Sequence, residues 1–357
     1  MLNILRGWID RYFGEEEAVL LALILVASLL IILTMGSVLA PAIAGLIIAF
    51  LLQGLVNRLT SWKLPHWGAV SIATFVLIAL VALFFLYLMP VLWQQAIRLV
   101  GEVPGMLTEW QRILLLLPEQ YPQLITEHQI QEVMDSVGRE IGALGQDVLS
   151  FSVSSLPLVA GVLLYVILVP ILVFFFLKDS DNILTWMASF LPKQRPMMSQ
   201  IWHEMNDQVA NYVRGKVIEI IVVGVVSYIS FAVLGLNYAL LLGLAVGLSV
   251  VIPYIGAAVV TLPVMMIGFF QWGLGNEFYW LFAVYCVIQA LDGNVLVPLL
   301  FSEAVNLHPV AIILAVLIFG GLWGFWGVFF AIPLATLVKA VFSAWPLARS
   351  AAEAELN

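Results

Sequence analysis

Apolar residues fall in long runs separated by short polar segments. A helix needs about 20 apolar residues to cross a bilayer, because the hydrocarbon core is ~30 Å thick. Four runs precede Lys178, and they cover residues 18–35, 38–56, 68–93 and 156–177. Six more runs follow, and they cover residues 217–236, 238–252, 256–272, 278–300, 309–319 and 325–344. This pattern predicts an all-α polytopic membrane protein with about eight transmembrane helices.

Two of the later runs, 238–252 and 309–319, are too short to cross a bilayer. Each adjoins a break rich in glycine and proline. The breaks contain Pro253 and Gly256 in the first case, and Gly320, Gly321, Gly324 and Gly327 in the second. Such interruptions are typical of re-entrant or broken helices that line a substrate site. We therefore expect two broken helical hairpins, with Gly243 and Gly247 allowing close helix packing.

The joint between the first two runs, Gly36 to Pro41, predicts a tight helical hairpin, with one broken helix as the alternative. Residues 94–150 are polar and mainly acidic, with apolar residues at helical spacing, which predicts amphipathic helices. The expected regions are the N-terminal transmembrane helices, an acidic helical segment, a transmembrane helix, an amphipathic segment, a transmembrane core and a tail. They cover residues 1–93, 94–150, 151–178, 179–216, 217–345 and 346–357, respectively.

Loop charges predict the orientation of the chain. Arg58 and Lys63 follow the second run, and five basic residues lie between 178 and 216. Cytoplasmic loops carry an excess of Lys and Arg, so both segments are expected in the cytoplasm. The segment 94–150 then lies on the outer side, and both termini are cytoplasmic.

Composition narrows the classes of function. The chain is 63% hydrophobic and 10% charged, with a mean hydropathy of +1.08, whereas soluble domains carry about 25% charged residues. The net charge of −8 offers no basic surface for nucleic acid. One cysteine, Cys286, provides no disulfide framework within the chain. Motifs for nucleotide binding, for a zinc protease and for a catalytic nucleophile are absent, so we expect no enzymatic activity, no cofactor and no metal site. We expect membrane lipid to surround the chain.

One acidic residue dominates the candidate chemistry. Residues 217–338 contain no Lys or Arg, yet they include Asp292. An ionised group at the centre of a transmembrane helix costs at least ~2.5–3.5 kcal/mol, so it usually faces a partner, a cavity or a transport path. Gln289 and Asn294 lie within one helical turn, and Pro298 weakens the helix further on. These oxygen ligands suit a small cation or a proton relay, whereas the alternative is a cap on a helix break or a contact between subunits.

Two other ionisable residues have weaker claims. His308 precedes Pro309 at the start of an apolar run, where it either titrates near neutral pH or serves the structure. Glu219 follows Arg214 and Lys216 at the edge of a run, which predicts pairing with one of these bases.

Several motifs together resemble the autoinducer-2 exporter family of bacterial membrane proteins. They are Phe175-Phe176-Leu177-Lys178-Asp179, Tyr212-Val213-Arg214-Gly215, Ile252-Pro253-Tyr254-Ile255-Gly256, Asp292 with Asn294 and Pro298, Leu307-His308-Pro309, Phe319-Gly320-Gly321-Leu322-Trp323-Gly324 and Ala331-Ile332-Pro333-Leu334. The resemblance implies an inner-membrane transporter without an ATPase, a homo-oligomer (a pentamer), and a transport role for Asp292 and Asn294. Gly293 separates these two residues, where much of the family has Asp followed directly by Asn.

The resulting hypothesis is a secondary transporter of the bacterial inner membrane. It exports a small molecule similar to autoinducer-2, or exchanges cations for protons, through a polar site of Asp292, Gln289, Asn294, Pro298 and His308. One alternative is a Na⁺(Li⁺)/H⁺ antiporter without an organic substrate. Others are a non-conducting oligomeric scaffold that acts through residues 94–150, and a channel.

Overall fold

The computed structural model describes residues 16–114, 156–193, 195–301 and 307–345, and six single positions between 115 and 155. Every regular element in these ranges is helical. Seven of these helices are long and apolar enough to cross a membrane, and two shorter apolar helices accompany them. This confirms the all-α polytopic membrane fold, with seven such helices in the described ranges where the sequence suggests about eight.

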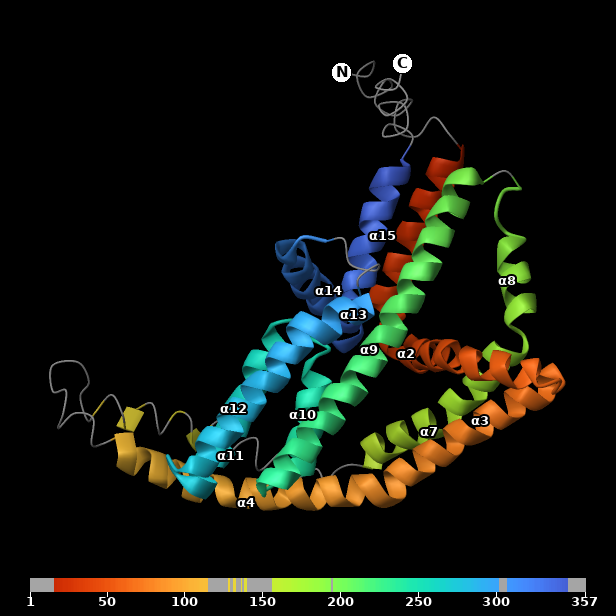
Figure 1. The fold of residues 1–357 in the computed structure, drawn as a ribbon. Helices are drawn as coiled ribbons and strands as arrows, with labels where there is room; N and C mark the ends of the chain where they lie inside the picture. The colour runs from red at the N-terminus through yellow and green to blue at the C-terminus, as the bar shows by residue number, and fades with distance from the viewer. Residues whose placement is uncertain are drawn as a thin grey trace, which may run out of the picture.

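The first two apolar runs form one helix. Helix α2 (Glu16–Ser61) is 46 residues long and contains Pro41, and Figure 1 shows that it bends sharply. The tight hairpin expected at this joint is wrong, and the alternative of one broken helix holds. A proline inside a helix removes one hydrogen bond and kinks the axis without reversing the chain. Gly36 serves packing instead of a turn: a Cβ there would come within 2.5 Å of Nε1 of Trp323.

The next helix is continuous over three parts: α3 (His66–Leu83), the π-helical turn η1 (Phe84–Leu88) and α4 (Met89–Leu114). Helix α4 extends well into the segment expected outside the membrane. It runs beneath the ends of later helices in Figure 1. The backbone N–H of Leu241 donates to Oε1 of Gln95 at 3.0 Å, and the Trp110 ring lies 5.8 Å from that of Phe269. Most of residues 115–155 lie outside the described ranges.

Helix α7 (Leu156–Lys178) packs with α2 and α3 around one apolar cluster that includes Val56, Val70 and Val173. His66 Nε2 lies 3.3 Å from the carbonyl oxygen of Leu177, so the basic ends of these helices meet. The short helix α8 (Ser180–Ala188) then leads toward the second half of the molecule.

The second half is built around α9 (Pro196–Leu234), which ends at Gly235 in the left-handed conformation (φ 74°). Glycine adopts this conformation readily and is therefore common after helices. Helix α10 (Ala239–Ser249) packs against α9 through small residues: a Cβ on Gly247 would lie 2.7 Å from the Ile220 carbonyl oxygen, and one on Gly243 would lie 2.7 Å from Cα of Tyr228. The packing role predicted for both glycines is confirmed.

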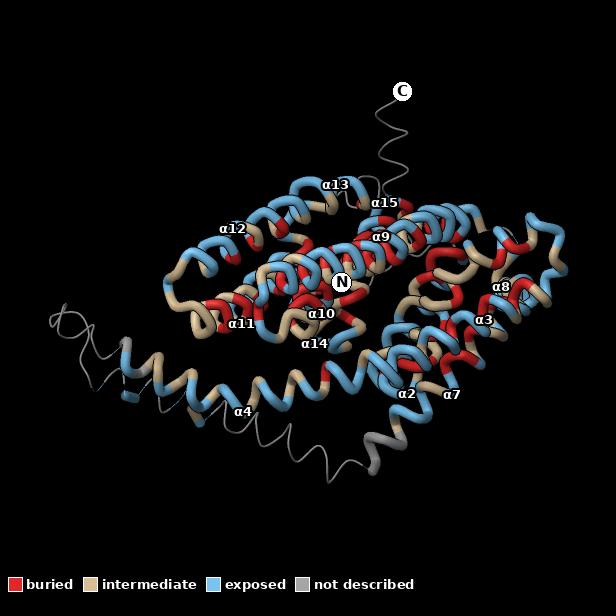
Figure 2. Tube along the Cα trace, turned by 60° about the horizontal axis from the view of Figure 1, so that its bottom comes forward, coloured by how far each residue is buried: buried red, intermediate tan, exposed pale blue. Residues whose placement is uncertain are grey.

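Helices α11 (Ile255–Trp272) and α12 (Asn276–Leu291) complete this core. The π-helical turn η2 (Asp292–Leu296) and α13 (Val297–Phe301) continue α12. Figure 2 shows buried positions along α9, α10 and α11, whereas α12 and α4 are mostly exposed.

Two hairpins have matching breaks. The first hairpin is formed by α10 and α11, and the second by α14 (Pro309–Phe329) and α15 (Ala331–Ala344). The reversal of the second hairpin falls inside α14, where Gly324 has φ 59° and ψ −136°. Both broken hairpins expected from the sequence are therefore present.

Candidate functional site

A buried ion pair lies at the centre of α9. Nζ of Lys216 lies 2.6 Å from Oε2 of Glu219, and the two residues are only 4% and 2% exposed. Burying two charges is costly, and their attraction offsets the cost only when further polar contacts are available. Lys216 has such a contact, because Nζ donates to the carbonyl oxygen of Val250 at 3.0 Å. Pairing of Glu219 with a nearby base is thus confirmed, with Lys216 as the base.

Aromatic rings complete the surroundings of the ammonium group. Nζ of Lys216 lies 5.1 Å from the ring centre of Phe301 and 6.0 Å from that of Tyr212. A cation at this distance from an aromatic face is attracted by the negative charge on the face of the ring. The ammonium group therefore has a carboxylate, a backbone carbonyl and two aromatic rings around it.

The same part of α9 contacts both hairpins. Val250 is the residue at the end of α10, in the first break. Tyr212 donates its hydroxyl hydrogen to the carbonyl oxygen of Phe329, 2.9 Å away and at the end of α14. Residues 212–219 of α9, which we call the clamp segment, thus bind a backbone carbonyl in each hairpin.

Two further contacts fix the clamp segment in place. Arg214 lies over the Phe50 ring of α2, 4.9 Å from its centre. Gly215 leaves room for Phe301, since a Cβ would come within 2.8 Å of that ring. The Tyr-Val-Arg-Gly motif is therefore a sequence of packing contacts that ends at the buried Lys216.

Asp292 begins the π-helical turn η2, which contacts α9. Its Oδ1 atom is buried without a hydrogen-bond partner, and so is Nε2 of Gln289 three residues earlier. The charge of Lys216 acts on Asp292, and the charge of Asp292 acts on Glu219. A π-turn shifts the helical register locally, and such turns are frequent at functional sites. Lys216, Glu219 and Asp292 therefore lie close enough for their charges to interact, where η2 meets α9.

The other predicted polar residues do not join this cluster through any described contact. Asn294 is exposed, and its Nδ2 donates to the Ala290 carbonyl oxygen at 2.8 Å on the same helix. Pro298 lies exposed in α13. His308 is the N-cap of α14, where Nδ1 accepts from the backbone N–H of Val310 at 3.3 Å. This contact gives His308 a local role at the helix start.

The predicted backbone residues lie at the two breaks. Pro253 accepts a hydrogen bond from the N–H of Ile255 at 2.7 Å, and Tyr254 between them has φ 62°. In both hairpins a buried glycine on the second arm touches the first arm directly. A Cβ on Gly256 would overlap the Ser249 carbonyl group, and one on Gly327 would overlap that of Phe319. Gly320 packs near Val328, whereas Gly321 is exposed with open space around it.

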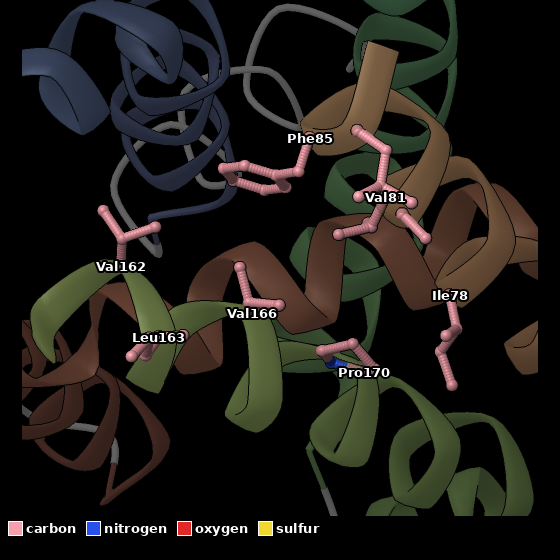
Figure 3. A pocket seen from close by; sticks show the side chains of 9 residues that line it. Ile78, Val81, Phe85, Val162, Leu163, Val166 and Pro170 are labelled. Carbon is pink, nitrogen blue, oxygen red and sulfur yellow. The ribbon is translucent and has the colours of Figure 1, made fainter. Parts of the chain in front are cut away.

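A separate pocket of about 420 Å³ lies between α3, η1 and α7. Figure 3 shows Phe85 from η1 and Val166 and Pro170 from α7 at its wall, and every lining residue is apolar. The pocket contains none of the predicted site residues. In the described part of the chain, no group of three His, Cys, Asp or Glu side chains could hold a metal ion.

The sequence matches a known family of membrane proteins. The sequence model of the AI-2E family transporters matches residues 19–347, nearly the whole chain. The chain belongs to the AI-2E transporter family. Both hairpins, the clamp segment and Asp292 lie within the matched range.

Relatives within the AI-2E family cover almost the full length. The chain is 47% identical over 346 residues to "Putative permease PerM" of Escherichia coli (strain K12), covering 97% of this chain and 98% of that protein. It is 27% identical over 309 residues to "Putative transport protein YueF" of Bacillus subtilis (strain 168), covering 85% and 82%. It is 22% identical over 327 residues to "AI-2 transport protein TqsA" of E. coli (strain K12), covering 89% and 91%. The protein is thus a multi-pass membrane transporter or permease of this family.

The sequence indicated Asp292 in this AI-2E transporter but missed the importance of Lys216. The boundary placed at 216 assigned Lys216 to a cytoplasmic segment, whereas α9 runs unbroken from Pro196 to Leu234. A signal was present, because Lys216 and Glu219 have opposite charges three residues apart and so share one helix face. Tyr212 gave no comparable signal, since its partner is 117 residues away.

Proposed function

We propose that this AI-2E transporter moves a small organic solute similar to autoinducer-2 and couples its movement to protons at Asp292. The observation that carries the proposal is the buried, unpartnered Oδ1 atom of Asp292 beside the Lys216–Glu219 pair. A buried carboxylate oxygen without a hydrogen-bond partner is costly while ionised and far less so when the group is protonated. Asp292 can therefore take up a proton on one side of the membrane and release it on the other.

The hairpins provide a route from the proton to the solute. The charge of Lys216 acts on Asp292, and the same ammonium group binds the first hairpin at Val250. The clamp segment also binds the second hairpin through Tyr212. A change of charge at Asp292 thus alters the strength with which Lys216 binds the Val250 carbonyl oxygen at the break of the first hairpin. In this proposal, motion of the two hairpins opens the site to alternate sides.

Exchange of Na⁺ or Li⁺ for protons, without an organic solute, is the second candidate. It is favoured by the presence of two carboxylates, Glu219 and Asp292, in one buried region. Oxygen ligands of this kind suit small cations. The name of the relative TqsA favours the organic solute instead.

We further propose an inner-membrane location with both termini in the cytoplasm. The start of α2 and the end of α15 support this, because Ala18, Leu21 and Ala344 pack in one cluster at one end of the molecule. The exposed apolar residues of α2, such as Leu23 and Leu30, are available for lipid or for neighbouring copies in a homo-oligomer, with a pentamer as the expected form.

Purified protein in liposomes that contain a pH dye tests the proposal. Addition of autoinducer-2 on one side is expected to cause proton movement in the wild type. In Asp292→Asn this movement should fall by at least tenfold, because the amide is neutral at every pH. Glu277→Gln is the matched control, since Glu277 is an exposed carboxylate at the other end of α12 and should leave the rate unchanged. Full proton movement in Asp292→Asn would contradict the proposal.

The same liposomes separate the two candidates. Proton movement driven by a Na⁺ or Li⁺ gradient in the absence of any organic solute would favour exchange of these cations for protons. Proton movement that requires the organic solute and does not depend on a Na⁺ or Li⁺ gradient would favour export of the solute.

A further inference from the structure

Lys216 occupies surroundings that match those of a bound cation. Its ammonium group contacts a carboxylate oxygen of Glu219 at 2.6 Å and the Val250 carbonyl oxygen at 3.0 Å. Carboxylate and carbonyl oxygens are the ligands that alkali and alkaline-earth ions take in proteins. The carbonyl belongs to a helix break, where backbone oxygens are released from helical hydrogen bonds. The ligands for a cation are therefore present, and a side chain of the protein itself uses them.

We propose that Lys216 is the resident cation of this site and makes the transporter independent of Na⁺ and Li⁺. With Lys216 in place, the Glu219 charge is already compensated, and the Val250 oxygen is already bound. The proposal builds on the proposed role of Asp292 by specifying the coupling ion as a proton.

Electrostatic balance supports the same choice of ion. The ionisable groups that face Lys216 are Glu219 and Tyr212 on α9, and Asp292 on η2. When Asp292 carries a proton, one ammonium and one carboxylate remain, and the region is neutral. When Asp292 is ionised, one negative charge remains, and the adjacent ammonium repels any metal ion that approaches it. A proton neutralises Asp292 and, in contrast to a metal ion, needs neither a cavity nor additional oxygen ligands.

Replacement of the ammonium group should uncover the hidden site. In Lys216→Gln the shorter, neutral side chain leaves the Glu219 carboxylate uncompensated and frees the Val250 carbonyl oxygen. A sodium ion can then bind there and stabilise the folded protein by mass action. We expect NaCl, compared with N-methyl-D-glucamine chloride at equal ionic strength, to raise the melting temperature of this variant by roughly 3 °C or more. The wild type should show no such difference between the two salts.

Two matched variants separate ion binding from general effects of the substitution. Lys216→Arg keeps a tethered cation and should show no response to sodium. The double variant Lys216→Gln with Glu219→Gln removes both charges and should also show none. If the single variant does not fold while the double variant does, the uncompensated Glu219 charge is the cause, which supports the role assigned to Lys216.

Two outcomes would overturn the proposal. One is stabilisation of the wild type by sodium to the same extent as Lys216→Gln. The other is a folded Lys216→Gln protein that does not respond to sodium. Both measurements report binding and stability without any transport, so their results are distinct from a failure of Asp292→Asn to lose proton movement.

Discussion

At the scale of single residues, the clamp segment shows how a few polar contacts can position two hairpins. Buried polar groups in a protein are stabilising when each has a partner and costly when one is left alone. Lys216 satisfies the Val250 carbonyl in the first hairpin, and Tyr212 satisfies the Phe329 carbonyl in the second. Both residues lie on one continuous helix, so the two hairpins share a common anchor.

Substitution of Tyr212 by Phe should therefore weaken the second hairpin alone. The ring contacts with Phe301 and Phe329 are retained, whereas the hydrogen bond to the Phe329 oxygen is lost. We expect a loss of ~1–3 kcal/mol in the free energy of unfolding, because a buried carbonyl is left without its partner. Thermal unfolding in detergent measures this loss, and hydrogen exchange should increase at residues 325–330.

Tyr228→Phe is the control for that experiment. Tyr228 is 39% exposed on the same helix, so removal of its hydroxyl group should change stability by less than about 0.5 kcal/mol. Equal losses in the two variants would show that the contact with Phe329 contributes nothing.

At the scale of elements, each hairpin is closed by one glycine. Gly256 and Gly327 lie where any side chain would strike the backbone of the preceding arm. The arms can approach this closely only because glycine has no Cβ. The two contacts span seven residues in the first hairpin, from Ser249, and eight in the second, from Phe319. Both hairpins therefore close through a glycine at similar spacing, although their sequences differ.

Gly327→Ala should open the second hairpin. The added methyl group meets a backbone carbonyl, which cannot rotate away as a side chain could. We expect a loss at or above the upper end of the ~1–3 kcal/mol usual for overpacking, measured as a fall in the melting temperature in detergent. Gly321→Ala, in the same hairpin but with open space around it, should be neutral or slightly stabilising. Equal melting temperatures for the two variants would refute this account of the break.

The hairpins could be predicted from the sequence because glycine and proline have strong local effects. Gly320, Gly324 and Gly327 interrupt an apolar segment, and the run before them, 309–319, is too short to cross a membrane alone. The same reasoning failed at Gly36 and Pro41, because the glycine packs against Trp323, 287 residues away in the sequence. Local signals cannot distinguish a glycine that turns the chain from one that admits a distant side chain.

Part of the candidate site could not be predicted from the sequence, because it depends on contacts between residues that are distant along the chain. The isolated charge of Asp292 in an apolar run was visible, and so was its neighbour Gln289. The burial of Lys216 depends on Val250 and Phe301, which reach it from other helices. Its position at the end of the polar segment 179–216 assigned it to the cytoplasmic side, and its burial follows only from the three-dimensional packing.

At the scale of the whole molecule, three helix ends meet far from the hairpin breaks. The starts of α2 and α9 and the end of α15 share an apolar cluster that includes Ala18, Met197 and Ala344. Glu17 of α2 is buried among them, and its Oε1 accepts a hydrogen bond from the backbone N–H of Met198 at 2.6 Å. The free N–H groups at the start of α9 need such an acceptor, because Arg195 makes no side-chain cap there.

Glu17 therefore caps a helix 181 residues away and ties the first helix of the chain to the helix that holds the candidate site. A carboxylate is also favourable at this place because the start of a helix carries partial positive charge. We expect Glu17→Ala to lower the free energy of unfolding by ~0.5–2 kcal/mol, the range usual for loss of an N-cap, as measured by thermal unfolding in detergent. Glu16→Ala removes the same charge from the exposed neighbouring position and should have little effect, so a comparable loss there would attribute the result to net charge instead of the cap.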